Sequence, residues 1–313
     1  MAAAARAPAA EFSRWSGRMI FYLVTKPHAY TMRTYLADWG RALAERITIV
    51  PYAQFVARDK QPRGSYIFSD LDRVNADWLP RLQQHWDELI RTGNARKLLN
   101  EPARVMTRLP LLQALHAAGV NDFDACPIEP NKPPMPNRFP VFIREANDHK
   151  GPVTELIRNQ SELVQYLDYC ARAGKLSGAP IVVEFVDTAD SSGVYRKYSA
   201  FRFGDHIVPA HIVTGRDWVV KSTNSESGAR YIAEELDYVQ SNPHATELMT
   251  LFSIANIDYG RIDYSLRGGR IQVFEINTNP IIMHPGESSN PQRMKKRRIT
   301  AAAIERALLS LDE

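Results

Sequence analysis

Apolar positions follow two different spacings in the first hundred residues of the chain. Short apolar runs of strand length occupy 19–24, 47–52 and 64–71, whereas 31–46 and 78–90 repeat apolar residues every three or four positions, as amphipathic helices do. Strands that alternate with helices in this way predict a small parallel α/β unit at the start of the chain.

The spacing changes after this unit. From Asn100 to Ala118 the apolar residues recur at helical intervals up to Gly119, a glycine suited to end a helix. The segment 126–139 holds five prolines, which predicts an extended linker or crossover. Further along, the pattern predicts a buried strand at 140–144, a helix at 161–174, a strand at 179–187, a hairpin at 196–213, and helices at 245–256 and 299–311.

The most informative pattern lies near the C-terminus, where two extended segments flank a Gly-Gly pair at 268–269. Side chains alternate along a strand, so Val273, Glu275 and Asn277 share one face, opposite Phe274 and Ile276. A two-residue loop would pair Asp263 with Phe274 on the wrong face, whereas a loop of three or five residues pairs Asp263 with Glu275. We therefore expect an odd-length loop with a left-handed glycine and a bulge.

Carboxylate and amide oxygens on neighbouring strands suit a hard cation such as Mg²⁺ or Mn²⁺, which in turn binds phosphate groups. Asp263, Glu275 and Asn277 are the candidate ligands. The alternative is an ordinary hairpin with a solvated polar face. Asparagine is a poor strand former, so several polar oxygens on one strand face favour the metal site.

This pattern, Asp263 followed after a hairpin by Glu275-x-Asn277-x-Asn279-Pro, resembles the metal-binding end of the ATP-grasp family. The segments from about residue 100 onward resemble the rest of that fold in order, over roughly two-thirds of the chain. The resemblance implies an α+β ATP-grasp fold with an N-terminal α/β (pre-ATP-grasp-like) domain. The expected division is a disordered tail at 1–18, the α/β domain at 19–100, a central subdomain with the nucleotide hinge at 101–187, and a C-terminal subdomain with the metal site at 188–313.

The resemblance also assigns residues that bind phosphate. In the family the strand matching 140–144 ends in a lysine; here it ends in Arg144, whose planar guanidinium still offers donors to phosphate oxygens. A salt bridge from Arg144 to the adjacent Glu145 or to another carboxylate is the alternative. The phosphate-covering loop at 146–152 is poor in glycine, and Lys150 is its candidate phosphate contact, an exposed lysine without a role being the alternative.

The strand at 179–187 resembles the family's nucleotide hinge. Its backbone from Glu184 to Val186 would pair with adenine, and Phe185 and Val186 would supply apolar contact. Glu184 or Asp187 would accept hydrogen bonds from the ribose hydroxyls. Such strands occur in many α/β cores, so an ordinary core strand is the alternative.

Four basic residues compete for contact with the transferred phosphate, namely Arg196, Lys197, Arg202 and Lys221. The sequence does not choose among them, and an exposed polar residue remains the alternative for each. Ser288, Ser289 and His284 are candidates for the wall of a substrate pocket.

Composition narrows the function classes. The chain has 313 residues, 44% hydrophobic and 24% charged, with a net charge of +4, and no basic run is interleaved with aromatics as a nucleic-acid groove requires. No apolar run reaches the length of a membrane span, and residues 1–18 lack the apolar core of a signal peptide. Cys126 and Cys170 have no metal or redox spacing, which suits a reducing cytoplasm.

The resemblance implies an ATP- and Mg²⁺-dependent ligase that joins a carboxylate to an amine through an acyl phosphate, releasing ADP and phosphate. A small-molecule kinase on the same fold and a non-catalytic nucleotide- or metabolite-binding protein remain alternatives. The expected partners are small-molecule or peptide carboxylates and amines, without nucleic acid or membrane. Dimers are common in this family, so a homodimer remains one option. Neither the substrates nor the oligomeric state follows from the sequence.

Overall fold

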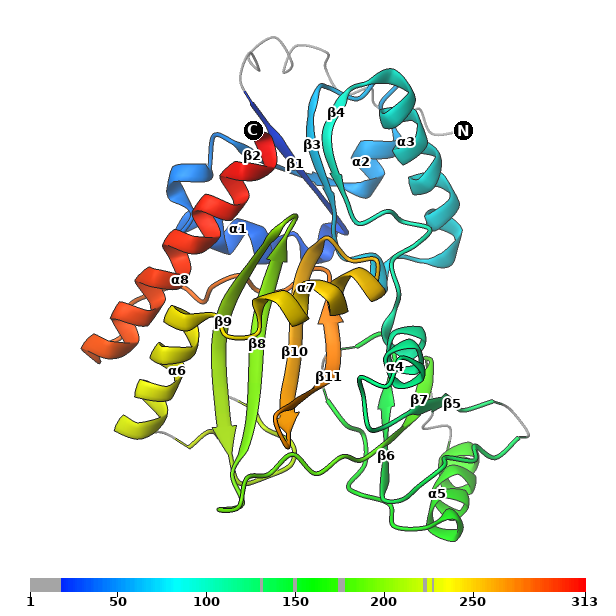
Figure 1. Cartoon of the computed structure of the whole chain (residues 1–313). Coiled ribbons are helices and arrows are strands. Elements are labelled where there is room, and N and C mark those ends of the chain that lie inside the picture. Colours follow the sequence, from blue (N-terminus) through cyan, green and yellow to red (C-terminus); the bar gives the residue numbers. More distant parts are fainter. Residues whose placement is uncertain (1–17, 130–131, 149–150, 174–177, 222–223, 227) are drawn as a thin grey trace.

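The computed structural model describes residues 18–313 except 130–131, 149–150, 174–177, 222–223 and 227. Residues 1–17 of the expected disordered tail, and Lys150, therefore lie outside the described residues. Along the described part of the chain, an N-terminal sheet, a central sheet and a C-terminal sheet follow one another, each with its own helices (Figure 1). This mixed architecture confirms the predicted α+β class.

The N-terminal sheet is entirely parallel, with the strand order β2-β1-β3-β4. Its strands are β1 (Ile20–Val24), β2 (Ile47–Pro51), β3 (Gly64–Phe68) and β4 (Ala95–Leu99), and its helices are α1 (Tyr30–Ala37), α2 (Tyr52–Val56) and α3 (Leu79–Thr92). The predicted parallel α/β unit is confirmed. Strand β4 was not predicted, because it is a short edge strand with exposed charged residues at its centre.

Both faces of this sheet are buried, because alternate side chains along β1 pack into two different hydrophobic clusters. Ile20 and Tyr22 pack on one side with residues of α1 and of the C-terminal helix, including Leu308. Phe21 and Leu23 pack on the other side with residues of α2 and α3. The C-terminal helix therefore covers one face of the N-terminal sheet, so that β1 and the last helix share one hydrophobic core.

The central sheet is antiparallel, with the order β5-β7-β6. It consists of β5 (Ala125–Pro127), β6 (Val141–Glu145) and β7 (Pro180–Glu184), with helices α4 (Arg108–Ala117) and α5 (Gln160–Ala173). The predicted strands at 140–144 and 179–187 and the predicted helix at 161–174 are confirmed within a few residues, whereas β5 begins the segment that was predicted as an extended linker. Helix α4 begins eight residues later than its apolar spacing suggests, because Glu101–Arg104 form a separate turn.

The C-terminal sheet is antiparallel and has the order β11-β10-β8-β9. Its strands are β8 (Tyr195–Phe203), β9 (His206–Gly215), β10 (Tyr259–Arg267) and β11 (Arg270–Asn277), and its helices are α6 (Ala229–Ser241), α7 (Ala245–Ile254) and α8 (Pro291–Leu309). Short 3-10 helices are η2 (Lys26–His28), η3 (Arg41–Leu43), η4 (Leu71–Arg73), η5 (Ala76–Trp78) and η7 (Ser310–Asp312). Helices α6 and α7 cover this sheet in Figure 1.

The β10–β11 hairpin confirms the predicted pairing of Asp263 with Glu275, but the predicted odd-length loop is wrong. The loop has two residues, Gly268 and Gly269, with φ of +55° and +80°. A bulge inside β11 restores the register instead, because Tyr264 pairs with Val273 while Asp263 pairs with Glu275, leaving Phe274 as the extra residue.

The bulge also changes the faces of β11. Val273 and Ile276 are both buried beneath the sheet with the residues of α7, whereas Phe274 and Glu275 both line a pocket on its other side. The predicted shared face of Val273 and Glu275 is therefore wrong. Within the described residues, no helix combines the length and the apolar composition needed to cross a membrane.

Candidate functional site

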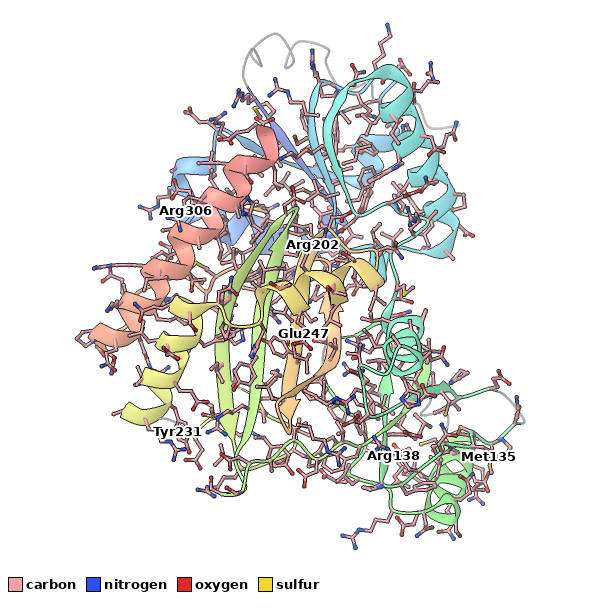
Figure 2. The ribbon with its side chains drawn as sticks, in the orientation of Figure 1. Met135, Arg138, Arg202, Tyr231, Glu247 and Arg306 are labelled. Carbon is pink, nitrogen blue, oxygen red and sulfur yellow. The ribbon has the colours of Figure 1, made fainter. Side chains whose placement is uncertain are left out.

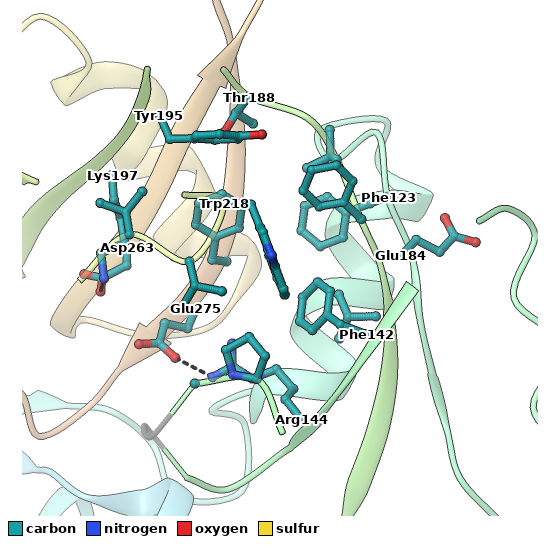
Figure 3. A pocket seen from close by; sticks show the side chains of 18 of the residues that line it. Phe123, Phe142, Arg144, Glu184, Thr188, Tyr195, Lys197, Trp218, Asp263 and Glu275 are labelled. Atoms are coloured by element: carbon teal, nitrogen blue, oxygen red, sulfur yellow. Dashed lines mark hydrogen bonds and ion pairs between the residues drawn. The ribbon is translucent and has the colours of Figure 1, made fainter. Parts of the chain in front are cut away.

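A pocket of about 430 Å³ lies between the central sheet and the C-terminal sheet (Figure 3). Nine of the thirteen predicted site residues line it: Arg144, Glu184, Phe185, Val186, Arg196, Lys197, Lys221, Asp263 and Glu275. They come from β6, β7, β8, β10 and β11 and from the segments that follow β7 and β9. The fold thus brings together residues that are distant in the sequence.

One end of the pocket is aromatic. The ring of Trp218 lies 5.0 Å from the ring of Phe142 and 5.8 Å from the ring of Phe185, between centroids. Phe123 and Phe274 lie 6.3 Å apart and complete this wall. Flat apolar surfaces of this kind suit a planar heterocycle. The sequence analysis missed Trp218; its only signal was a tryptophan followed by two valines in the connection after β9.

Strand β7 and the residues that follow it offer the pocket a backbone N–H group rather than a side-chain carboxylate. The N–H group of Val186, a buried residue on the pocket wall, forms no hydrogen bond within the described part of the chain. A buried N–H group needs a partner, which a ligand in the pocket would supply. This is the donor that the predicted adenine contact requires.

The Glu184 side chain points away from the pocket in Figure 3. Its oxygens accept hydrogen bonds from the backbone N–H groups of Asp124, Asn137 and Arg138, and from Nε of Arg138 at 3.2 Å. This carboxylate therefore holds the segments around β5 and before β6, and the predicted ribose contact by Glu184 is not supported. Asp187 is exposed, does not line the pocket, and accepts the N–H of Ala189 at 3.0 Å.

The other end of the pocket is charged, and Asp263 is its first carboxylate. Its Oδ1 atom accepts hydrogen bonds from Ser199 Oγ at 2.8 Å and from Arg261 Nε at 3.0 Å. Its Oδ2 atom lies 3.8 Å from Nζ of Lys197. Lys197 lines the pocket beside Asp263 and so has the position of a cation that could contact a phosphate.

Glu275, the second carboxylate, lies between two arginines. Its Oε2 atom accepts hydrogen bonds from Nη2 of Arg144 at 3.2 Å and from Nη2 of Arg108. Burial lowers the pKa of the Arg144 guanidinium, and the charge of Glu275 counteracts this effect. The alternative interpretation of Arg144, a salt bridge to Glu145 or another carboxylate, is thus met by Glu275, which the β10–β11 bulge brings to the pocket.

Arg108 is a functional candidate that the sequence analysis missed. Its buried guanidinium donates through Nη1 to the backbone carbonyls of Glu145, Ala146 and Asp148, at 2.9, 2.7 and 2.7 Å. It therefore fixes the start of the 146–152 loop against Glu275. The sequence alone did not single out Arg108, because it is the first residue of an apolar helix and an arginine at that position normally faces solvent.

The donor set fits Mg²⁺ held jointly with phosphate oxygens, but not a cation held by protein alone. Asp263 and Glu275 face each other across the strand pair, whereas Asn277 does not line the pocket and its Oδ1 accepts the N–H of Asn279 at 2.8 Å. The described residues contain no group of three or more His, Cys, Asp or Glu side chains placed to hold a metal ion. One or two carboxylates plus substrate phosphates is the usual Mg²⁺ environment.

Two of the four basic candidates are engaged elsewhere. Arg202 donates to the carbonyls of Gly204 and Ile257, pairs with Asp258 at 3.1 Å and does not line the pocket, so its predicted phosphate contact is corrected to a structural role. Figure 2 labels Arg202 near the end of the C-terminal sheet that lies next to the N-terminal sheet. Arg196 lines the pocket, but its guanidinium is bound by Asp190 and Glu234, which raise its pKa against the opposing effect of burial.

Lys221 lies against the loop predicted to cover phosphates. Its Nζ atom is 3.4 Å from the place where a Cβ at Gly151 would be, and Gly151 has a φ of +104°, which favours glycine. Lys197 and Lys221 are therefore the basic candidates that the pocket geometry supports.

Comparisons with known proteins agree with this arrangement. The sequence matches no family model, and no curated protein is similar to it. Among solved structures, the D-alanine–D-alanine ligase of Bacillus anthracis complexed with ATP has 12% identity, covers 94% of this chain and 99% of its own, and has a TM-score of 0.50. The D-alanine–D-alanine ligase of Coxiella burnetii has 14% identity, covers 94% of each chain, and has a TM-score of 0.51. The chain therefore has the ATP-grasp fold.

Proposed function

We propose that this protein is an ATP-dependent ligase that joins a carboxylate to an amine, with an acyl phosphate as intermediate. The observation that carries the proposal is that one pocket has an aromatic end and a charged end. Its aromatic end, at Phe142, Phe185 and Trp218, suits adenine, and its charged end, at Lys197, Asp263 and Glu275, suits a polyphosphate. The structurally similar ligases, one of them complexed with ATP, support the same direction.

The nucleotide would lie along the pocket from the hinge to the carboxylates. Adenine would receive a hydrogen bond from the N–H of Val186 and pack on the aromatic wall. The phosphates would then reach Arg144, Lys197 and Lys221, which can donate to their oxygens. Asp263 and Glu275 would hold Mg²⁺, which when bound neutralises charge on the phosphates.

In the proposed reaction, an oxygen of the substrate carboxylate attacks the γ-phosphorus of ATP, and ADP leaves. The fixed cations Arg144 and Lys197 stabilise the charge that spreads over the transferred group, because they are positioned before the reaction begins. The acyl phosphate must then be kept from water until the amine attacks its carbonyl carbon.

Cys126 and Cys170 are free thiols, consistent with the expected cytoplasmic location, which stays a prediction.

The test is a product analysis with Mg²⁺-ATP and a mixture of the twenty protein amino acids. We expect ADP, free phosphate and a new amide, detected by mass spectrometry, and loss of all three in Asp263→Asn and Glu275→Gln. Asp205→Asn is the matched control, because Asp205 is an exposed carboxylate at the β8–β9 turn of the same sheet. A phosphorylated acceptor without free phosphate would identify a kinase instead, and ATP binding without any product would identify a binding protein.

A further inference from the structure

Four polar side chains meet at the carboxyl edge of the N-terminal sheet. Thr25 and His28 directly follow β1, while Asp70 and Arg73 follow β3. In the order β2-β1-β3-β4, the chain crosses from one side of β1 to the other, so the connections of β1 and β3 leave in opposite directions. Open parallel sheets bind ligands in the crevice at this kind of switch point.

Asp70 organises this cluster. It is fully buried and has a φ of +61°, a left-handed conformation that costs a non-glycine residue about 1 kcal/mol or more. Its Oδ1 atom accepts a hydrogen bond from Arg73, and its Oδ2 atom accepts one from Thr25 and lies 2.8 Å from Nδ1 of His28. The carboxylate is thus held from three sides.

The contact with Asp70 defines the state of the His28 ring. Because a carboxylate oxygen accepts hydrogen bonds, the tautomer that fits this contact carries its hydrogen on Nδ1 and donates it to Asp70, which leaves Nε2 as the lone-pair acceptor. The His28 side chain is 32% exposed, so this cluster is open to a ligand on the histidine side. A histidine oriented by a buried aspartate is a common arrangement for proton transfer.

The cluster is joined to the segment that follows β11, the strand that carries Glu275. Nδ2 of Asn279 donates to the carbonyl of His28 at 3.3 Å, and the N–H of Leu71 donates to Oγ1 of Thr278 at 3.1 Å. Asn279 follows Glu275 by four residues, which is at most about 13 Å of extended chain. The cluster is therefore tied to the segment that follows Glu275, the carboxylate at the charged end of the pocket.

The pocket itself lacks a suitable base for the second half of the proposed reaction. An amine is protonated at neutral pH and must lose a proton before or during its attack on the acyl phosphate. The described lining of the pocket contains no histidine, and its three carboxylates are Glu184, Asp263 and Glu275. Glu184 is bound to backbone N–H groups, and the other two face cations and the proposed metal ion.

Tyrosine does not fill this role either. Burial and then the neighbouring Asp187 carboxylate raise the pKa of Tyr195 to about 12, so its phenolate is not available at neutral pH. A base must therefore come from outside the described lining, and His28 is a histidine whose backbone carbonyl is bonded to Asn279, four residues after Glu275.

We propose that His28 is a catalytic residue that accepts the proton of the incoming amine, and that Asp70 is its positioning residue. The role rests on the proposed ligase function. The nitrogen lone pair forms the bond to the acyl carbon, the bond from that carbon to the phosphate oxygen breaks, and phosphate leaves with the electron pair. The protonated amine loses two protons: the first passes to Nε2 of His28 before the attack and then to solvent, and the second leaves the nitrogen as the bond to the phosphate oxygen breaks and is taken up by the departing phosphate, so charge and atoms balance.

The experiment separates the two halves of the reaction. Each variant receives Mg²⁺-ATP and the amino-acid mixture, once alone and once with hydroxylamine, which is largely unprotonated at neutral pH and traps acyl phosphates as hydroxamates without a base. In His28→Asn we expect the rate of amide formation to fall by about 100-fold, whereas hydroxamate formation is retained. The asparagine amide can still donate to Asp70, which preserves the cluster, and added imidazole should restore part of the amide rate.

His206→Asn is the matched control, because His206 is exposed at the β8–β9 turn and should leave both rates unchanged. Thermal unfolding of each variant checks that the fold is intact. Full amide formation in His28→Asn, or an equal loss of amide and hydroxamate in a folded variant, would overturn the role of His28 alone. Absence of both products in the unmutated protein would overturn the proposed function, and the role of His28 with it.

Discussion

Asp263 lies directly opposite Glu275 across the β10–β11 pair because Phe274 bulges out of register. The two-residue turn alone would have paired Asp263 with Phe274, which would leave the carboxylates on opposite faces of the sheet. One extra residue thus places both acidic groups, and an aromatic ring, on the same side of the strand pair. The charged end of the pocket depends on this irregularity.

Arg108→Met should weaken both the fold and nucleotide binding. The change removes the donor to the carbonyls of Glu145, Ala146 and Asp148 and one cation from Glu275, so we expect the free energy of unfolding to fall by about 3 kcal/mol. Urea unfolding and titration calorimetry with Mg²⁺-ATP measure the two effects. In the control Arg104→Met, which removes an exposed arginine next to α4, both quantities should stay near those of the parent.

Trp218→Leu should lower the affinity for ATP without changing stability greatly. Loss of a stacking surface for adenine corresponds to about a tenfold increase in the dissociation constant. Trp78→Leu is the control, since Trp78 belongs to the N-terminal unit and contacts Arg81. Equal affinities of Trp218→Leu and the parent in calorimetry would show that adenine does not bind at the aromatic wall.

Arg202→Met should reduce stability but not activity per folded molecule. The variant leaves two buried carbonyls and Asp258 without their cation, which we expect to cost about 3 kcal/mol of unfolding free energy. Denaturant unfolding gives the stability, and ADP release at a temperature well below the transition gives the activity. A large fall in turnover at unchanged stability would return Arg202 to the catalytic candidates.

His211 should make the fold sensitive to mild acid. Burial, and next the nearby cations Arg261 and Lys296, lower the pKa of His211 well below its ordinary value of 6.5. Below about pH 6.5 the unfolded chain binds a proton that the folded chain does not, so the free energy of unfolding falls with pH, by up to about 1.4 kcal/mol per unit.

Urea unfolding of the parent and of His211→Gln at pH 7.5 and pH 5.5 measures this contribution, since glutamine cannot titrate in that range. The parent should lose more stability between the two conditions than the variant does. Identical losses in the two proteins would mean that His211 is protonated to the same extent in the folded and unfolded states.

Much of the fold could be predicted because its elements have regular apolar spacing. The parallel N-terminal unit, the hairpin pairing of Asp263 with Glu275 and the strands at 141–145 and 180–184 follow from local patterns. Helix α6 was missed, and β4 was missed because an exposed edge strand buries few of its side chains. The sequence analysis placed the irregularity in the turn, whereas it lies inside β11 at Phe274. An odd-length turn and a bulge within the strand produce the same pairing of Asp263 with Glu275, so the sequence could not distinguish them.

The site was harder to predict because its composition depends on tertiary contacts. Lys197, Arg144 and Glu275 could be singled out from the family resemblance, and they do line one pocket. Arg108 and Trp218 carry no local signal of function, since one opens an apolar helix and the other lies in a short connection of mixed polarity after β9. Arg202 has the charge of a phosphate contact, but its surroundings bind it to backbone carbonyls.

The most direct test of the account is titration calorimetry of Mg²⁺-ATP into the parent, Asp263→Asn, Glu275→Gln and the control Asp205→Asn. We predict that the parent and the control bind one nucleotide with an affinity that falls when Mg²⁺ is removed. The two pocket variants should bind more weakly and with little dependence on Mg²⁺. Nucleotide binding that is equal in all four proteins, or absent from the parent, would contradict the assignment of this pocket as the nucleotide site.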